Sequence, residues 1–131
     1  MEYPAIIVNS NSENSKEAKT CLSRRDIPFY ESTSRKDAEQ LLGDFVGSDV
    51  RDIMVCGGDG SANVLLNAYM NLPLEMQANV NFSFLPSGKA NDFVRALGQP
   101  LRFEESLDYV LNVASIDSVD VIRVNENYFF T

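Results

Sequence analysis

The sequence predicts an α/β fold in which helices cover a mostly parallel sheet. Short apolar runs, typical of buried strands, alternate with helix-length segments whose apolar residues recur at helical spacing. Polar turns separate them, which is the order expected for crossover units that join parallel strands. The chain of 131 residues is 44% hydrophobic and 23% charged, which suits one compact domain with a true core.

The first strand is predicted over residues 4–8, because the run PAIIV is apolar throughout and fits a strand buried on both faces. The polar turn NSNS follows it. Ser12 or Asn14 can then cap a helix that continues to about Arg25. A short second strand is predicted over residues 28–31.

A second helix is predicted to start from a cap at Thr33 or Ser34. Its apolar residues recur at helical spacing and are Ala38, Leu41, Leu42, Phe45 and Val46. The third strand is predicted over residues 53–56. A glycine-rich turn separates it from a helix predicted over residues 61–71.

The remaining elements complete the α/β order and add a hairpin. They are a strand over residues 81–85, a short helix over 92–97, an amphipathic helix over 103–111, a strand over 118–124 and a return strand over 128–130. The chain then stops on an apolar strand, so we expect it to be the first part of a longer protein. The alternative is that the hairpin packs on the sheet as the natural edge of the fold.

The composition argues against several classes of function. The formal net charge is −8, from 11 basic and 19 acidic residues, which argues against a nucleic-acid partner. Histidine is absent, so catalysis would depend on carboxylates, lysine or metal-bound water. Cys21 and Cys56 form no metal-binding pair and are predicted to be small buried hydrophobes of a reducing compartment. Without a membrane-length apolar run or a signal peptide in residues 1–30, a cytoplasmic protein is expected.

The most informative segment is the glycine turn, GGDGS at residues 57–61. Glycine reaches backbone angles closed to other residues and lets backbone N–H groups approach a ligand closely. The N-terminus of the following helix adds positive potential where a phosphate would lie. Asp59 is the candidate acid, which could help to hold a magnesium ion or accept a proton from a hydroxyl. The alternative is a purely structural turn, because tight turns are rich in glycine and aspartate for backbone reasons alone.

A second polar loop follows the fourth strand, in the segment LPSGKANDF. It is not a Walker-type phosphate loop, because Ser83 stands where a glycine is required and Ala90 where a magnesium-binding hydroxyl is required. Asn91 is expected to cap the short helix and to tie neighbouring loops, with Phe93 packed beneath. Lys89 could reach a phosphate, and a solvated loop lysine is the alternative.

Three polar turns are predicted to meet at one edge of the sheet, namely the turn after Val8, the glycine turn and the loop after Leu85. Ligands of parallel α/β sheets bind outside the carboxyl ends of the strands. The sequence therefore predicts a pocket for a polyphosphate at this edge, with Asp59 and Asn91 on the same side of the molecule.

Together these segments resemble the catalytic domain of the diacylglycerol kinase family, which includes sphingosine kinases and bacterial YegS-like lipid kinases. The glycine turn matches the family's GGDGT motif and is followed by Asn63 and Asn67, where the family usually has asparagines. The segment LPSGKANDFVRAL is similar to the family's P-x-G-T-x-N-D-F-A-R segment, and NSNS to its N-P-x-S-G turn. Thr33–Ala38 is similar to a threonine-containing loop, and Ile116–Phe130 to an aspartate-bearing strand and hairpin.

The resemblance implies a three-layer α/β/α, Rossmann-like nucleotide-binding domain of the NAD kinase type over residues 1–131. The β-rich second domain of the family is absent from this chain. The implied activity is that of an ATP-dependent lipid kinase, which transfers the γ-phosphoryl group to a lipid hydroxyl such as that of diacylglycerol, with Mg²⁺ on the phosphates. The lipid would bind through the second domain, so the fragment alone is expected to be inactive. A peripheral membrane contact of the full-length protein and a homodimer are left open.

The residues implied near the nucleotide come from all three turns. Gly57, Gly58 and Gly60 would let the backbone wrap the phosphates, and Ser61 would donate to one of them. Asp59 is the catalytic and the metal-binding candidate. The other nucleotide-binding candidates are Asn9, Ser10, Asn11, Ser12, Thr33, Asn63 and Lys89.

Three departures from the family pattern bear on activity. Val64 replaces a glutamate shortly after the glycine turn, and Lys89 replaces a threonine. Ser10 and Glu13 replace the proline and glycine of the first turn, and Glu13 would repel phosphate. Two alternatives therefore stay open: a nucleotide-binding or regulatory module without catalysis, and a kinase for a soluble acceptor such as NAD.

Overall fold

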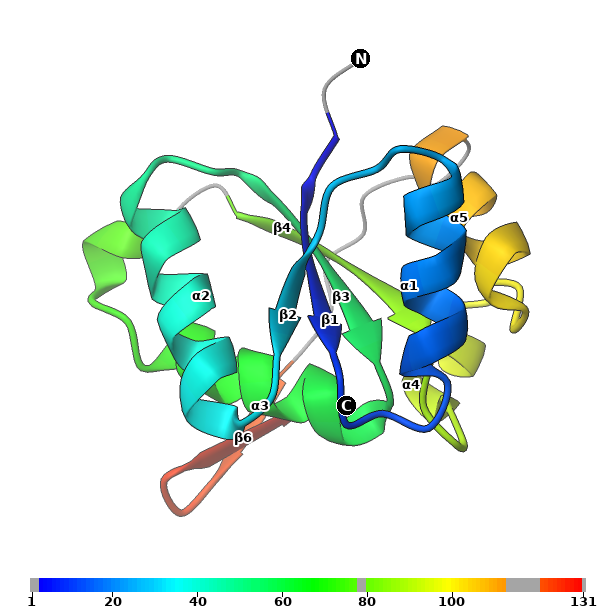
Figure 1. Ribbon diagram of the computed structural model, residues 1–131. Helices are drawn as coiled ribbons and strands as arrows, with labels where there is room; N and C mark the ends of the chain where they lie inside the picture. Colours follow the sequence, from blue (N-terminus) through cyan, green and yellow to red (C-terminus); the bar gives the residue numbers. More distant parts are fainter. Residues whose placement is uncertain (1–2, 78–79, 113–120, 131) are drawn as a thin grey trace.

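The computed structural model describes residues 3–77, 80–112 and 121–130, and it contains a four-stranded parallel sheet at its centre (Figure 1). The strand order is β2-β1-β3-β4. The bounds are Ala5–Asn9 for β1, Tyr30–Ser32 for β2, Asp52–Gly57 for β3 and Asn81–Pro86 for β4. The predicted parallel sheet is therefore confirmed.

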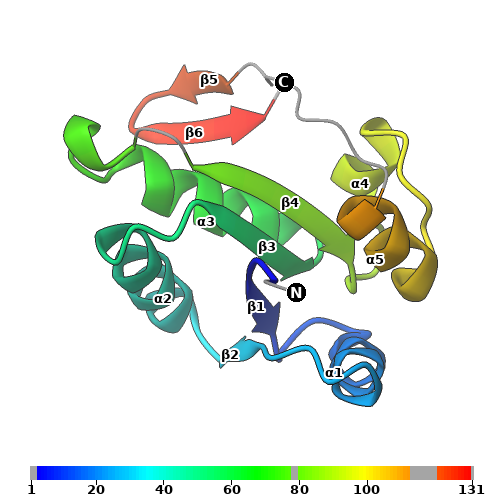
Figure 2. The ribbon, with the colours of Figure 1, turned by 90° about the horizontal axis from the view of Figure 1, so that it is seen from above.

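Helices cover both faces of this sheet, which makes the three layers expected from the sequence (Figures 1 and 2). The helices α1 (Ser15–Arg24) and α5 (Phe103–Asn112) lie on one face. The helices α2 (Arg35–Gly47) and α3 (Asp59–Met70) lie on the other. The short α4 (Asp92–Ala96) follows β4, and its Val94 joins the core cluster under α2 and α3.

The continuous apolar runs are explained by burial on both faces. In β1, Ile6 and Val8 belong to the core under α1 and α5, whereas Ile7 belongs to the core under α2 and α3. In β3, Met54 and Ile53 divide between the two cores in the same way. Successive side chains of a strand point to opposite faces, so in a strand buried on both faces every side chain is buried and apolar residues are favoured at each position.

The register brings the ends of the strands to one edge. Val8 pairs with Cys56, and Gly57 pairs with Pro86. Because the strands are parallel, the segments that follow them all leave the sheet at the same edge. This is the edge where the sequence predicted the three polar turns to meet.

Element boundaries differ from the predicted ones by a few residues. The helix predicted from residue 61 begins at Asp59, so the acid of the glycine turn is already helical. A short 3₁₀ helix, Leu74–Met76, was not predicted. The hairpin strands are β5 (Val121–Val124) and β6 (Asn127–Phe130), and residues 118–120 of the predicted strand lie outside the described residues.

The hairpin forms a separate two-stranded antiparallel sheet and does not extend the central one. It lies against α3 (Figure 2), where it is bound through Asn67. Its Ile122 and Phe129, which face each other in the register, are about half exposed, whereas Phe130 packs inward.

Both cysteines are buried and free, as predicted. Burial raises the pKa of the Cys56 thiol far above its ordinary value, and burial together with a hydrogen bond to Glu104 raises that of Cys21. Both thiols therefore stay protonated and act as small apolar groups. Among the described residues, no helix combines the length and the low charge that crossing a bilayer requires.

Candidate functional site

Three loops meet at the carboxyl edge of the sheet, as the sequence predicted. The backbone N–H of Asn14, in the loop after β1, donates to the carbonyl of Ser87, in the loop after β4, at 2.8 Å. The N–H of Ser87 donates in turn to the carbonyl of Gly57, in the glycine turn, at 3.1 Å. The hydroxyls of Ser12 and Ser87 lie 3.0 Å apart. These contacts fix the three loops as one unit.

Asn9, at the end of β1, connects the first loop to the start of α3. Its side-chain Nδ2 donates to Ser61 Oγ at 2.7 Å, and its Oδ1 accepts the backbone N–H of Asn11 at 3.0 Å. Since Asn9 supplies the proton to Ser61, the Ser61 hydroxyl keeps its own proton for another acceptor. Two of the predicted site residues are thus brought together directly.

Gly57 and Gly58 are required for close approach and not for unusual backbone angles. Positive φ is found among described glycines only at Gly98, and Gly58 is extended, with φ −98° and ψ −165°. A Cβ on Gly57 would collide with the side chain of Ser61. A Cβ on Gly58 would lie 3.1 Å from the Cα of Gly88. The expectation that the turn glycines adopt angles closed to other residues was therefore wrong, because Gly57 is constrained by the Ser61 side chain and Gly58 by the backbone of the loop after β4.

Asp59 spans the glycine turn and the loop after β4. Its Oδ2 accepts the backbone N–H of Asp92 at 3.0 Å, and its Oδ1 accepts that of Phe93 at 2.8 Å. These N–H groups belong to the first turn of α4, which has no partners within its own helix for them. Asp59 thus caps α4 from a distance of 33 residues in the sequence, and the prediction that Asp59 and Asn91 lie on the same side is confirmed.

Asn91 occupies the N-cap position of α4, but its side chain does not cap the helix. Its Oδ1 accepts the N–H of Gly88 at 3.0 Å, and its Nδ2 donates to the carbonyl of Gly88 at 3.1 Å. Asn91 has left-handed backbone angles, φ 54° and ψ 41°, which asparagine tolerates better than most residues. The prediction that the Asn91 side chain caps α4 was therefore wrong. The side chain of Asp59 accepts the N–H groups at the start of α4, and the side chain of Asn91 binds Gly88 in its own loop.

The start of α3 has no side-chain cap. Its N-cap residue is Gly58, which offers no side-chain acceptor, and Gly60 is exposed with open space where a Cβ would be. The acid of the first turn, Asp59, is directed at α4 instead. By contrast, α2 is capped by Ser34, whose hydroxyl accepts the N–H of Asp37 at 3.0 Å. The first N–H groups of α3 are therefore open to an external acceptor.

Asn14 shows a related arrangement at the start of α1. It is the N-cap residue, yet its side chain makes no cap hydrogen bond and donates instead to the carbonyl of Gly88 at 3.3 Å. The sequence correctly placed Asn14 at a helix start. It did not show that the side chain would serve the neighbouring loop.

Thr33, Asn11 and Ser10 lie at the outer side of the site. The carbonyl of Thr33 accepts Asn11 Nδ2 at 2.7 Å, which ties the loop after β1 to the loop after β2. The backbone N–H and the hydroxyl of Thr33 both donate to Asp37 and lower the pKa of that carboxyl. The Ser10 hydroxyl donates to Glu31 at 2.9 Å. The hydroxyl protons of Thr33 and Ser10 are therefore already bound within the protein.

Asn63 and Lys89 are placed differently from the other candidates. The backbone carbonyl and Oδ1 of Asn63 both face Asn67 Nδ2, at 2.9 and 3.4 Å, one turn further along α3. Lys89 is exposed in the loop after β4 and makes no ion pair with any described residue. Val64, where the resembled family has a glutamate, packs on the core.

No role was assigned to Ser87 from the sequence, and Asn67 was named only as a position where the resembled family has an asparagine. Ser87 is completely buried, yet its hydroxyl and both backbone groups join the three loops. Asn67 is 7% exposed and binds the backbone of Tyr128. A buried asparagine among the apolar positions of a helix is a recognisable signal, because such a side chain needs hydrogen-bond partners.

Beneath the glycine turn lies a cavity of about 10 Å³, lined by residues of the glycine turn, by Asn91 of the loop after β4 and by Phe84, Phe93 and Val94. It has room for about one water molecule, so a ligand would bind on the outer side of the loops. No group of three or more acidic, cysteine or histidine side chains with metal-binding geometry occurs within residues 3–77, 80–112 and 121–130. A metal ion here would thus need ligands from a bound phosphate in addition to Asp59.

Comparison with protein families identifies one match, which covers most of the chain. Residues 5–124 match the diacylglycerol kinase catalytic domain. A probable YegS-like lipid kinase of Shewanella frigidimarina is 32% identical over 93 residues, which is 71% of this chain and 29% of that protein. Another probable YegS-like lipid kinase, of Yersinia enterocolitica, is 28% identical over 135 residues, which covers 99% of this chain and 45% of that protein.

A solved structure has the same fold. The crystal structure of a putative diacylglycerol kinase from Bacillus anthracis superposes with a TM-score of 0.79 and 26% sequence identity, over 98% of this chain and 48% of that chain. The chain therefore spans less than half the length of these relatives.

Proposed function

This chain belongs to the diacylglycerol kinase catalytic domain family, and from that premise we propose that it is the ATP-binding part of a lipid kinase. The reaction proposed is transfer of the γ-phosphoryl group of ATP to the hydroxyl of a lipid such as diacylglycerol. Because the chain covers less than half of its relatives, the lipid would be bound mainly by parts of the full-length protein outside it.

The observation that carries the proposal is the open N-terminus of α3 at the junction of the three loops. Its first N–H groups have no side-chain cap, and the one acid of its first turn points toward α4. Unpartnered N–H groups and the positive end of the helix dipole favour a phosphate at this place. The open space at Gly60 would let the phosphate approach the backbone.

Two side chains would add to this binding. The Ser61 hydroxyl is held by Asn9 and keeps a proton that it can donate to a phosphate oxygen. Lys89 is exposed and follows Gly88, whose backbone lies against that of Gly58, so its flexible side chain would be able to reach a phosphate at the same site. Phosphoryl transfer depends mainly on such positioning and charge neutralisation.

Asp59 fits the part of a magnesium ligand or a proton acceptor. Each of its oxygens accepts one N–H and has a further lone pair available. Mg²⁺ in phosphoryl-transfer sites is commonly held by one or two carboxylates together with substrate phosphates, and it neutralises charge on the transferred group. The two N–H donors hold the Asp59 carboxylate in one orientation, which suits either role.

The test is an acceptor screen with the full-length protein and Mg·ATP. We expect phosphorylation of diacylglycerol or a related lipid in mixed micelles, and none of NAD or a sugar phosphate. Transfer to NAD or sugar phosphate, with none to lipid, would replace the proposal by a kinase for a soluble acceptor.

The second candidate function is nucleotide binding without catalysis. It is favoured by the two α4 hydrogen bonds of Asp59, which give this residue a complete structural role, and by the apolar packing of Val64. Calorimetry with ATP, combined with the acceptor screen, separates a kinase from a non-catalytic module. Binding of ATP with no turnover on any lipid tested would favour the non-catalytic module.

A further inference from the structure

Asn67 makes an unusual contact between α3 and the hairpin. Its Nδ2 donates to the carbonyl of Tyr128 at 2.9 Å, and its Oδ1 accepts the N–H of Tyr128 at 2.7 Å. The side-chain amide thus offers one donor and one acceptor to a single residue of β6, as the backbone of a neighbouring strand would. Its Nδ2 also donates to the carbonyl of Asn63 at 2.9 Å, so both N–H groups of the buried amide have partners.

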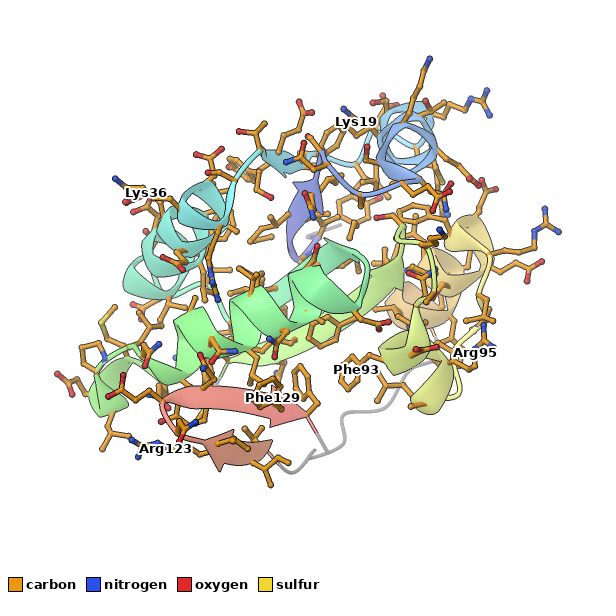
Figure 3. The ribbon with its side chains drawn as sticks, turned by 90° about the horizontal axis from the view of Figure 1, so that it is seen from below. Lys19, Lys36, Phe93, Arg95, Arg123 and Phe129 are labelled. Carbon is orange, nitrogen blue, oxygen red and sulfur yellow. The ribbon has the colours of Figure 1, made fainter. Side chains whose placement is uncertain are left out.

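A second contact lies at the end of the same strand. The ring of Phe130 stacks on that of Phe93, with centroids 4.2 Å apart and planes at 21°. It also meets the edge of Phe84 in β4, at 5.8 Å. Figure 3 shows Phe93 between α4 and the hairpin. The hairpin therefore supports the side chain of Phe93 from outside the core.

Phe93 connects these contacts to the site. Its backbone N–H donates to Asp59 Oδ1 at 2.8 Å, and its ring lines the cavity beneath the glycine turn. A shift of Phe93 would change the orientation of the Asp59 carboxylate, because the N–H that holds the carboxylate is on the same residue. Asp59 and Asn67 are eight positions apart on α3, about 12 Å along the helix axis, so they do not touch.

We propose that Asn67 is a positioning residue, which holds the β5–β6 hairpin on α3 so that Phe130 supports Phe93 and thereby orients the Asp59 carboxylate. This rests on the proposed function only for its effect on phosphoryl transfer. The coupling between the hairpin and the start of α4 is a property of the fold alone, and it can be measured without substrate.

The test of the coupling is amide hydrogen exchange, measured by NMR on the Asn67→Ala variant. We expect the amide protons of Asp92 and Phe93 to exchange about tenfold faster than in the unsubstituted protein, because their bonds to Asp59 open more often. The amide of Val8, in the sheet core, is expected to be unchanged. The matched control is Asn112→Ala, since Asn112 on α5 makes the same type of bond to the carbonyl four residues earlier but makes no hydrogen bond to the hairpin among the described residues.

A second variant, Phe130→Leu, distinguishes the proposed coupling from a general destabilisation of Asn67→Ala. Phe130→Leu keeps Asn67 and its bonds to Tyr128 but removes the ring that stacks on Phe93. It is expected to accelerate the exchange of Asp92 and Phe93 while that of Tyr128 stays slow. Faster exchange at Tyr128 in Asn67→Ala, with no change at Phe93 in either variant, would overturn the proposal.

Kinetics of the full-length protein complete the test. If Asn67 orients Asp59, Asn67→Ala is expected to lower kcat about tenfold with the KM for ATP changed less than about twofold, because the open N-terminus of α3 is untouched. An unchanged kcat, measured where the variant is folded, would contradict the positioning role. If no lipid is phosphorylated by the unsubstituted protein, the proposed function fails and the exchange result still decides the coupling.

Discussion

The backbone of Gly58 lies against the backbone of Gly88, so that a Cβ on Gly88 would be 2.8 Å from the nitrogen of Gly58. These two glycines belong to the turn after β3 and the loop after β4, 30 residues apart in the sequence. No side chain can be placed between them without separating the loops. This contact brings the start of α3, Asp59 and the start of α4 into one site.

Replacing Gly88 by alanine is therefore expected to lower the free energy of unfolding by about 1–3 kcal/mol, as other forced additions to packed regions do. Urea unfolding measures it. The control is Gly43→Ala in α2, where a Cβ meets nothing within 4 Å. That substitution is expected to raise the free energy of unfolding by up to about 1 kcal/mol through helix propensity. Equal effects of the two substitutions would contradict the packing argument.

Asp59→Asn in the full-length protein is expected to lower kcat by at least about a hundredfold, because an amide can neither accept a proton nor bind Mg²⁺ as a carboxylate does. Circular dichroism would show that the fold is kept, and thermal unfolding would measure the loss of one of the two α4 hydrogen bonds, since an amide has only one acceptor oxygen. Asp92→Asn is the control, since the carboxylate of Asp92 is exposed and only its backbone contacts Asp59. Near-normal phosphorylation by Asp59→Asn would remove Asp59 from the chemistry.

Lys89→Ala is expected to raise the Kd for ATP about three- to tenfold, because it removes the one candidate cation of the loop after β4 from the phosphates. The difference from the unsubstituted protein should shrink as salt is added, since exposed charges are screened. Isothermal calorimetry at two salt concentrations measures both effects. Lys36→Ala, on α2 (Figure 3), is the control and should leave the Kd unchanged; a loss of affinity there would indicate a general charge effect.

Ser34→Ala is expected to lower the free energy of unfolding by about 1 kcal/mol, because it removes the acceptor for the Asp37 N–H at the start of α2. Ser48→Ala, at the other end of the same helix, removes a hydroxyl that caps nothing and should have little effect. Urea unfolding of both variants gives the comparison. A larger effect at Ser48 would show that the cap has been wrongly assigned.

The Asp37 carboxyl gives a prediction about pH. The backbone N–H and the hydroxyl of Thr33 lower its pKa in the folded protein, so its contribution to stability is present above the unfolded pKa of about 3.9 and is lost as pH falls through the lower folded value. Thr33→Val removes the hydroxyl bond. The loss of stability in this variant should be largest near neutral pH and should shrink as the pH approaches about 3.

Urea unfolding over that pH range tests this, with Thr20→Val as the control. Thr20 is an exposed threonine of α1 without a carboxylate bond among the described side chains. A Thr33→Val effect that is the same at every pH would show that the hydroxyl acts through packing and not through the charge of Asp37.

The sequence predicted the parallel sheet and its covering helices well, because these elements follow from periodic patterns of apolar residues. The apolar runs around Ile7 and Val55 required burial on both faces, and the intervening amphipathic segments required parallel crossovers. Parallel strands end at the same edge, so the meeting of the three loops followed without any knowledge of contacts. The family resemblance rested on the same segments and agreed with the matched domain.

What the sequence by itself determined, then, is the order of strands and helices, the edge at which the polar loops gather and the residues of those loops. Only the tertiary structure decided which partner each polar group has: Asp59 binds the start of α4, Asn91 closes its own loop, and Asn67 holds the hairpin. The reason is physical. Buried positions recur with the period of each helix or strand, so they can be recognised in a short stretch of sequence. A hydrogen bond depends on the distance and direction between two groups, which only the folded chain brings together.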